Sequence, residues 1–248
     1  MKASAPSILI LGSNSDIAKA CARRFAAAGF ELWLASRECH AAQLDLMAQI
    51  RADHGAEVQH FVWDALEYER HADWVAALPR LPDVVLVAVG YLGTQTEAER
   101  DFAEAQRIIA SNFTGAVSVL THLVEPLLLR GAGSIIGISS VAGERGRASN
   151  YYYGAAKAAW TTYLSGLRQR GQQRGLRVLT VLPGYVRTKM IAHLATPAFL
   201  TASPEAVAEA IWRAHRGRRN RLYVKALWRP IMWVIRHLPE SFFKRLRL

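Results

Sequence analysis

Seven short apolar runs are spaced along this chain of 248 residues, and longer segments with helical periodicity separate most of them. The runs are rich in Val, Ile and Leu and apolar on both faces, which is typical of strands buried in a parallel sheet. Strands that alternate with helices predict a doubly wound parallel α/β sheet of seven strands in three α/β/α layers. We expect strands at 7–11, 31–35, 57–63, 84–89, 134–139, 177–182 and 221–225, and helices at 16–28, 40–53, 68–78, 98–130, 151–174 and 204–215.

The composition fits one large globular domain, because 51% of the residues are hydrophobic and 21% are charged. The two cysteines, Cys21 and Cys39, cannot build a disulfide framework, and no Cys/His cluster suggests a metal. The apolar run near the start is too short for a signal peptide, and no window approaches the ~20 uninterrupted apolar residues of a spanning helix. We therefore expect a cytoplasmic protein without a metal.

The first strand runs straight into a helix through a turn of small residues. Such a turn aims backbone N–H groups and a helix N-terminus at a phosphate, as in Rossmann-type dinucleotide sites. The usual fingerprint has three glycines, and only one is present here. An ordinary strand–helix turn capped by Asp16 is the alternative. The turn reads Gly12-Ser13-Asn14-Ser15-Asp16-Ile17-Ala18.

Residues at the ends of the next two strands bear on the choice of dinucleotide. Arg37 follows the second strand, at a position where an acidic residue suits NAD and an arginine suits the 2′-phosphate of NADP. Asp64 closes the third strand and is a candidate contact to the adenine end. The prediction is NADP(H), with a solvated Arg37 and an ordinary loop Asp64 as the alternatives.

The most specific pattern combines a serine, a tyrosine and a lysine. Ser140 follows the fifth strand, Tyr153 comes thirteen residues later, and Lys157 four residues after that. Residues four apart share a helix face, so the phenol and the ammonium can point into one cleft. We expect the cation to lower the pKa of Tyr153, which would act as general acid on a carbonyl oxygen that Ser140 orients. Tyr151 and Tyr152 have no lysine at this spacing.

These motifs, in this order, resemble the short-chain dehydrogenase/reductase family over about residues 7–225. The resemblance implies that Asn112 helps to hold a proton-relay water and that Lys157 also binds the nicotinamide ribose. It implies further contacts to the cofactor from Gly90 and from the segment Pro183-Gly184-Tyr185-Val186-Arg187-Thr188, chiefly Pro183, Gly184, Val186 and Thr188. The family's Asn-Asn-Ala-Gly after the fourth strand reads Val87-Ala88-Val89-Gly90 here, which is a departure.

A narrower resemblance concerns three segments of the chain. They look like the decaprenylphosphoryl-2-keto-ribose reductases of cell-wall arabinan synthesis, which reduce a 2-keto sugar left on a polyprenyl phosphate by a flavin-dependent oxidase. This resemblance implies a lipid-linked keto-sugar substrate and a flavin oxidase partner. The segments are residues 139–145, 186–190 and 236–239.

The end of the chain is strongly basic. Residues 212–248 contain eleven Lys and Arg against one acidic residue, whereas the preceding 211 residues contain twenty against nineteen. Within 227–248, a stripe of Ile231, Val234, Ile235, Leu238, Phe242 and Leu246 lies beside basic residues and the aromatic side chains of Trp228, Trp233 and Phe243. This pattern predicts a basic amphipathic helix at a membrane interface, and docking on the protein body is the alternative. No nucleic-acid-binding motif accompanies the charge.

Together these features predict a catalytic domain over 1–226 and a basic amphipathic segment over 227–248. The predicted activity is NADPH-dependent reduction of a ketone by Asn112, Ser140, Tyr153 and Lys157. Another lipid or 3-oxoacyl ketone is the alternative substrate, and a non-catalytic dinucleotide-binding membrane scaffold is the alternative function. The family resemblance also implies a homo-oligomer built through the helices around 98–130 and 151–174. The basic amphipathic segment predicts a protein that is peripheral on the inner face of the cell membrane.

Overall fold

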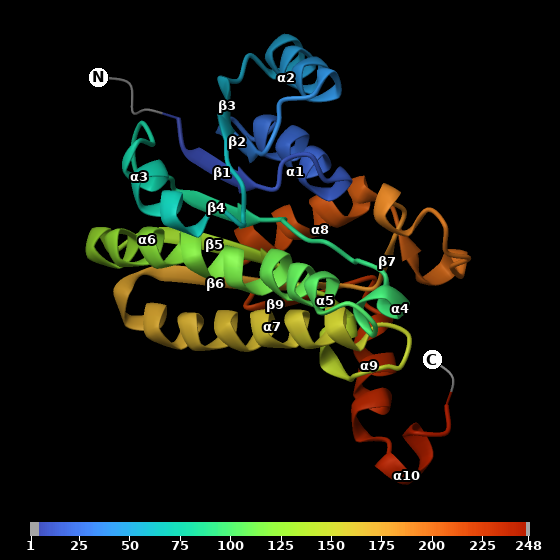
Figure 1. The fold of residues 1–248 in the computed structure, drawn as a ribbon. Helices are drawn as coiled ribbons and strands as arrows, with labels where there is room; N and C mark the ends of the chain where they lie inside the picture. The colour runs from blue at the N-terminus through green and yellow to red at the C-terminus, as the bar shows by residue number, and fades with distance from the viewer. Residues whose placement is uncertain (1–4, 247–248) are drawn as a thin grey trace.

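A parallel sheet of seven strands lies between two layers of helices in the computed structural model, which describes residues 5–246 (Figure 1). The strand order is β3-β2-β1-β4-β5-β6-β9, so the order reverses between β1 and β4. Ligands of such sheets bind beyond the carboxyl ends of the strands at this reversal. The predicted fold class is confirmed. The strands are β1 Ser7–Leu11, β2 Glu31–Ser36, β3 Val58–Val62, β4 Val84–Val87, β5 Gly133–Ile138, β6 Leu176–Pro183 and β9 Arg221–Val224.

Alternate residues of each strand feed two separate cores, because successive side chains point to opposite faces of a sheet. On one face, Ile8 and Ile10 of β1 pack beneath α1 Asp16–Ala26, α2 Ala41–His54 and α8 Pro204–Arg216. On the other face, Leu9 and Leu11 pack beneath α3 His71–Ala76, α6 Gly115–Arg130 and α7 Tyr151–Gly171. These two cores account for strands that read as apolar at every position.

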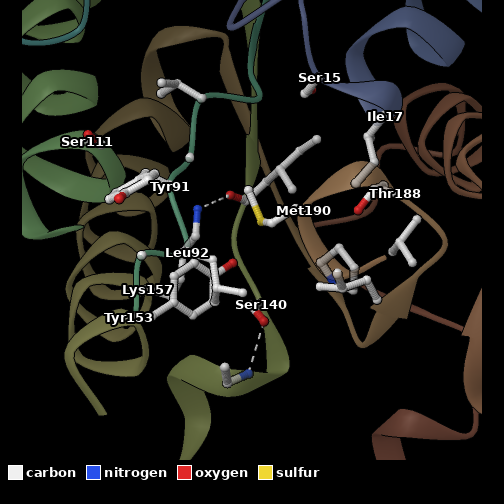
Figure 2. A pocket seen from close by; sticks show the side chains of 18 of the residues that line it. Ser15, Ile17, Tyr91, Leu92, Ser111, Ser140, Tyr153, Lys157, Thr188 and Met190 are labelled. Atoms are coloured by element: carbon white, nitrogen blue, oxygen red, sulfur yellow. Dashed lines mark hydrogen bonds between the residues drawn. The ribbon is translucent and has the colours of Figure 1, made fainter. Parts of the chain in front are cut away.

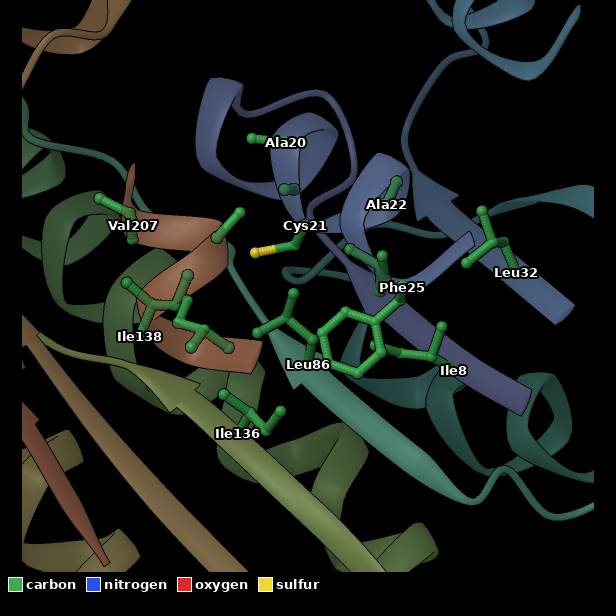
Figure 3. Packing of buried hydrophobic residues seen from close by; sticks show 14 of the residues in the cluster. Ile8, Ala20, Cys21, Ala22, Phe25, Leu32, Leu86, Ile136, Ile138 and Val207 are labelled. Carbon is green, nitrogen blue, oxygen red and sulfur yellow. The ribbon is translucent and has the colours of Figure 1, made fainter. Parts of the chain in front are cut away.

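The first core is closed by helices α1 and α8, which lie against each other as well as against the sheet (Figure 3). Phe25 and Cys21 of α1 are fully buried there, beside Leu86 of β4 and Val207 of α8. Burial raises the pKa of the Cys21 thiol to about 12, so this thiol is a packing group and not a nucleophile. Both cysteines are free, as expected.

The single helix predicted for 98–130 is divided into shorter pieces. After α4 Gln95–Ala98 the chain breaks, and Asp101 caps α5 Phe102–Ile109 by accepting a hydrogen bond of 2.9 Å from the N–H of Ala103. A π-turn, η2 Ala110–Thr114, then connects α5 to α6. The stretch from α5 through α6 is long and apolar enough to cross a membrane by length and composition alone. The buried apolar side chains of α6 belong to the second core, whereas Ala105 and Ile108 of α5 belong to a smaller cluster.

The basic segment begins as part of the protein body. Its helix α9, Trp228–His237, buries Trp228 and Met232 against Leu182 of β6 and Val141. The expected stripe is therefore wrong in two places, because Met232 faces the core while Val234 is 51% exposed. Trp228, expected at a membrane surface, is only 5% exposed. Residues 247 and 248, at the end of the predicted segment, lie outside the described residues.

Arg145 fastens the end of α9 and the short α10, Glu240–Phe243, to the body. Its guanidinium donates to the carbonyl oxygens of Arg236 and Leu238, both at 3.1 Å, and pairs with the carboxylate of Glu240 at 2.6 Å. The guanidinium also lies 4.1 Å from the centre of the Phe243 ring. The two helices project from the body of the protein (Figure 1), and the contacts of Arg145 lie on the side by which they are attached.

Candidate active site

A cleft of about 880 Å³ opens at the carboxyl ends of the strands, where the strand order reverses. Most of the predicted site residues line it, and Figure 2 shows part of its wall. Ser13 and Asn112 are the two that do not line the cleft, because both side chains are buried behind it. The predicted residues that line it are Gly12, Asn14, Ser15, Asp16, Ile17, Arg37, Asp64, Gly90, Ser140, Tyr153, Lys157, Pro183, Gly184, Val186 and Thr188.

Ser140, Tyr153 and Lys157 come together on the side of the cleft formed by β5 and α7 (Figure 2). Ser140 follows β5 in extended conformation, and its Oγ accepts a hydrogen bond of 3.1 Å from the N–H of Ala142. The hydroxyl of Ser140 acts on the phenol of Tyr153 and favours a lower pKa for it. The Nζ of Lys157 lies 5.6 Å from the centre of the Tyr153 ring and donates to the carbonyl of Ile138 at 3.3 Å. The i, i+4 spacing therefore places both side chains in one cleft, as predicted.

The pKa of Tyr153 differs from the expectation. Burial raises it to about 12, while the hydrogen bond from Ser140 acts in the opposite direction. Burial also lowers the pKa of the Lys157 ammonium to about 8. The expected lowering of the Tyr153 pKa by the cation is wrong for this arrangement, because loss of water around the phenolate dominates and only Ser140 acts against it. A phenol that keeps its proton at neutral pH is suited to act as an acid.

Asn112 braces the segment after β4 from within the π-turn. Its Oδ1 accepts from the N–H of Tyr91 at 3.3 Å, and its Nδ2 donates to the carbonyls of Tyr91 and Ile108 at 2.5 and 2.8 Å. A Cβ added at Gly90 would lie 3.0 Å from the same Oδ1, so Gly90 allows the close approach. The side chain thus ties the segment that follows β4 to the end of α5. π-turns of this kind are frequent at functional sites.

The turn after β1 requires its one glycine. Gly12 has a φ of +83°, and a Cβ there would lie 2.6 Å from the backbone nitrogen of Val89. Ser13 is fully enclosed, and its Oγ accepts a hydrogen bond from Gln43 of α2 at 3.1 Å. Helix α1 is capped by Ser15, whose Oγ accepts from the N–H of Ala18, so Asp16 is not the cap. The turn therefore presents the uncovered first N–H groups of α1 to the cleft.

Arg37 lies at the rim of the cleft, on a turn after β2 that is fixed by hydrogen bonds from two other residues of the cleft. The carbonyl of Glu38 accepts hydrogen bonds from the Nδ2 of Asn14 at 3.1 Å and from the Oγ of Ser36 at 2.9 Å. These contacts connect the end of β2 to the glycine turn. Asp64 lines the same region, and its Oδ1 accepts from the N–H of Leu66 at 3.0 Å.

The segment after β6 forms the opposite wall. Pro183 ends β6, and two short strands that the sequence did not predict, β7 Tyr185–Val186 and β8 Thr201–Ala202, enclose the following loop. A Cβ at Gly184 would lie 2.0 Å from the indole of Trp228, so Gly184 admits the tryptophan of α9. The carboxylate of Asp16 accepts from the N–H of Lys189 at 2.8 Å and thereby joins this wall to the start of α1.

Several residues of the cleft were not predicted from the sequence. Arg147 and Asn150 precede α7, and His193 and Leu194 lie on the loop between β7 and β8. Tyr91 lies beside the catalytic cluster in Figure 2. Of these residues, only Arg147 and Asn150 could have been placed near the site from the sequence, because they lie between Ser140 and Tyr153. No group of residues suited to hold a metal ion occurs within residues 5–246.

Comparison with known proteins agrees with this geometry. Residues 6–197 match the family model described as short chain dehydrogenase. An uncharacterized oxidoreductase of Mycobacterium tuberculosis is 36% identical over 243 residues, which covers 96% of each chain, and one of Streptomyces coelicolor is 35% identical over 97% of this chain and 95% of its own. The structure of a short-chain dehydrogenase from Sphingobium yanoikuyae in complex with NADPH superposes with a TM-score of 0.80 at 22% identity, covering 95% of this chain and 97% of that one. The chain belongs to the short-chain dehydrogenase/reductase family of oxidoreductases.

Proposed function

We propose that the protein is an NADPH-dependent reductase that transfers hydride to a ketone. The observation that carries this proposal is the meeting of Ser140, Tyr153 and Lys157 in the cleft beyond the carboxyl ends of the strands. This intact set also argues against a non-catalytic scaffold, because a protein that only binds the dinucleotide has no need of a partly buried phenol beside a buried ammonium.

The residues of the cleft fit a nicotinamide dinucleotide phosphate. The Gly12 turn leaves no room for a Cβ and lets the backbone approach a pyrophosphate at the start of α1. Arg37 at the rim offers a guanidinium to a 2′-phosphate. Asn14, Ser15, Ile17 and Asp64 would line the adenosine and pyrophosphate region, with Ser13 and Asp16 supporting the turn. Gly90, Lys157, Pro183, Gly184, Val186 and Thr188 would surround the nicotinamide end.

The side chains of the cleft would then deliver one proton to the carbonyl oxygen of the ketone. Ser140, whose Oγ accepts from the N–H of Ala142, would turn its hydroxyl proton to the carbonyl oxygen of the ketone and orient it. Tyr153, protonated because its pKa is raised to about 12, gives its proton to the oxygen as negative charge develops there. Lys157, with its ammonium behind the phenol ring, stabilises the phenolate that remains, and Asn112 holds the π-turn through which a water would resupply the proton. When bound, the nicotinamide supplies the hydride to the carbonyl carbon.

We infer that the ketone is a 2-keto sugar on a polyprenyl phosphate, produced by a flavin-dependent oxidase. The support is the likeness of residues 139–145, 186–190 and 236–239 to reductases of that class. Two of these segments contribute to the wall of the cleft, and the third contacts Arg145 of the first. Residues 139–142 and 186 with 188–190 line the cleft, and residues 236 and 238 accept hydrogen bonds from Arg145.

We also propose that the end of the chain rests on the inner face of the cell membrane. Docking of α9 leaves an exposed apolar side made of Leu227, Trp233, Val234, Phe242 and Leu246. Arg229, Lys244 and Arg245 are exposed nearby in the sequence, and this combination suits an anionic lipid surface. Liposome flotation of the full chain tests the proposal. Trp233→Ala with Phe242→Ala should abolish flotation, whereas replacement of Leu129, which is 77% exposed on α6, should leave it intact.

A homo-oligomer is proposed on the exposed apolar side chains of the helices around the site. Phe102 of α5 is 75% exposed, and Ile109 of α5 and Tyr151 of α7 are 38% and 40% exposed. Sedimentation of wild type and Phe102→Glu tests this proposal. A dimer that becomes monomeric in the variant supports it, and a monomeric wild type refutes it.

The reaction itself is tested by following NADPH absorbance with a panel of ketones, including a polyprenyl-phosphate 2-keto pentose. Oxidation of NADPH that depends on the ketone supports the proposal, and Ser140→Ala should lower kcat without changing NADPH affinity. Turnover of 3-oxoacyl esters with no turnover of the keto sugar would reassign the substrate. Absence of NADPH binding would refute the function.

A further inference from the structure

Arg147 lines the catalytic cleft as a partly buried cation that has no ion pair within residues 5–246. It lies in the loop between the 3₁₀ turn η3, Val141–Glu144, and α7, six residues before Tyr153. Its Nε is buried and has no hydrogen-bond partner, and none of the ion pairs within residues 5–246 includes it. Burial lowers the pKa of this guanidinium, and the phenol of Tyr185 is the group that counteracts the shift.

The neighbouring Arg145 shows what a structural arginine looks like in this loop. Arg145 donates to the carbonyl oxygens of Arg236 and Leu238 and pairs with Glu240, so its hydrogen-bonding capacity is used to attach the end of the chain. Arg147 has no comparable set of contacts. A buried donor such as the Nε of Arg147 destabilises the folded protein when it has no hydrogen-bond partner. Its presence in the cleft therefore calls for an explanation other than stability.

The surroundings of Arg147 favour an anionic ligand. Within the described residues, the carboxylates that line the cleft are Asp16 and Asp64. Asp16 accepts from the N–H of Lys189 and Asp64 from the N–H of Leu66, and neither affects the pKa of Arg147. A second buried polar atom without a partner, the Oδ1 of Asn150, lies in the same loop and can accept from a hydroxyl group. Residues 5–246 supply no carboxylate that pairs with Arg147, which leaves a bound ligand as a source of the anion.

We propose that Arg147 binds an oxyanion carried by the ketone substrate, and that it selects ketones with a phosphate, sulfonate or carboxylate group close to the carbonyl. The inference rests on the proposed reductase function and names the substrate class of the same site. The guanidinium gives a charge-assisted, planar contact to such a group, and Asn150 accepts from an adjacent hydroxyl. Without the anion the guanidinium stays unpaired, so neutral analogues bind less well.

The first test compares charged and neutral ketones of matched shape with the full chain and NADPH. The probes are 3-oxobutanoate and 4-oxopentanoate, each against its methyl ester. The wild type should prefer the acids, and Arg147→Gln should lower kcat/KM for the acids by roughly ten- to a hundredfold while it leaves the esters unchanged. Arg147→Lys should retain part of the preference. Arg100→Gln, which changes an exposed arginine outside the cleft, is the matched control.

Two results of this assay would overturn the inference. One is an equal loss of acid and ester turnover in Arg147→Gln, which would indicate a positional role. The other is weaker NADPH binding in Arg147→Gln, which would make the arginine a cofactor contact.

A second test needs no turnover and therefore separates this inference from the proposed function. With NADPH saturating, so that the site for its phosphates is filled, inorganic sulfate should raise the melting temperature of wild type and Arg100→Gln more than that of Arg147→Gln. An identical rise in all three proteins would overturn the anion site. Failure of every ketone together with an Arg147-dependent sulfate effect would refute the reductase and retain the anion site.

Discussion

Replacement of Trp228 by alanine should show that the end of the chain is part of the fold. The indole is 5% exposed, its N–H donates to the carbonyl of Leu200 at 3.2 Å, and its ring lies directly on Gly184. Truncation of a buried tryptophan costs about 3–5 kcal/mol. In a protein of this size such a loss lowers the melting temperature by roughly 6–20 °C.

The same helix offers a matched control, because Trp233 is 63% exposed. Trp233→Ala should change the free energy of unfolding by no more than about 0.5 kcal/mol. Urea denaturation followed by circular dichroism measures both variants, and NADPH titration shows whether the wall at Gly184 is loosened in Trp228→Ala. Equal denaturation midpoints for the two variants would refute the docking of α9.

Three further predictions concern the cofactor and the proton. Gly12→Ala should weaken NADPH binding, whereas Gly29→Ala should not, because both glycines have a φ of +83° but only Gly12 approaches another backbone; equal binding in the two variants would contradict this. Arg37→Ala should lower the affinity for NADPH by about tenfold or more and spare NADH, as measured by fluorescence titration. As the Lys157 ammonium titrates near its pKa of about 8, kcat should fall above that pH; a profile flat to pH 10 would contradict this role.

The fold could be predicted because its signals are local. Buried parallel strands are apolar throughout, so the seven runs were recognised and most of their bounds were correct within one or two residues. The break before α5 was missed because Asp101 reads as an ordinary helix residue until its side chain is seen to cap Ala103. Strands β7 and β8 are two residues long and depend on pairing across a loop, which leaves no periodic pattern.

The site was predictable where spacing along one helix carries it and not where distant segments meet. The Tyr153–Lys157 pair follows from helix geometry, but the pKa of Tyr153 depends on burial, which the spacing does not reveal. The stripe in α9 was misassigned because Trp228 and Met232 are buried by β6 and Val141, far away in the sequence. Arg147 could not be singled out from the sequence, because the feature that distinguishes it is a buried Nε without a hydrogen-bond partner, which only the folded structure reveals.

The central claim is that Tyr153 is the proton donor of a ketone reductase. Its most direct test is single-turnover reduction of a ketone by the NADPH-loaded full chain, with Tyr151→Phe, Tyr152→Phe and Tyr153→Phe compared side by side. Tyr153→Phe should lower the rate by ~10² or more while NADPH affinity is kept, because this is the phenol on which Ser140 acts in the cleft. The other two variants should remain active, since Tyr151 is exposed with its ring tilted against that of Tyr152, whereas the Lys157 ammonium lies over the Tyr153 ring. Loss of activity in Tyr152→Phe with an active Tyr153→Phe would contradict the account.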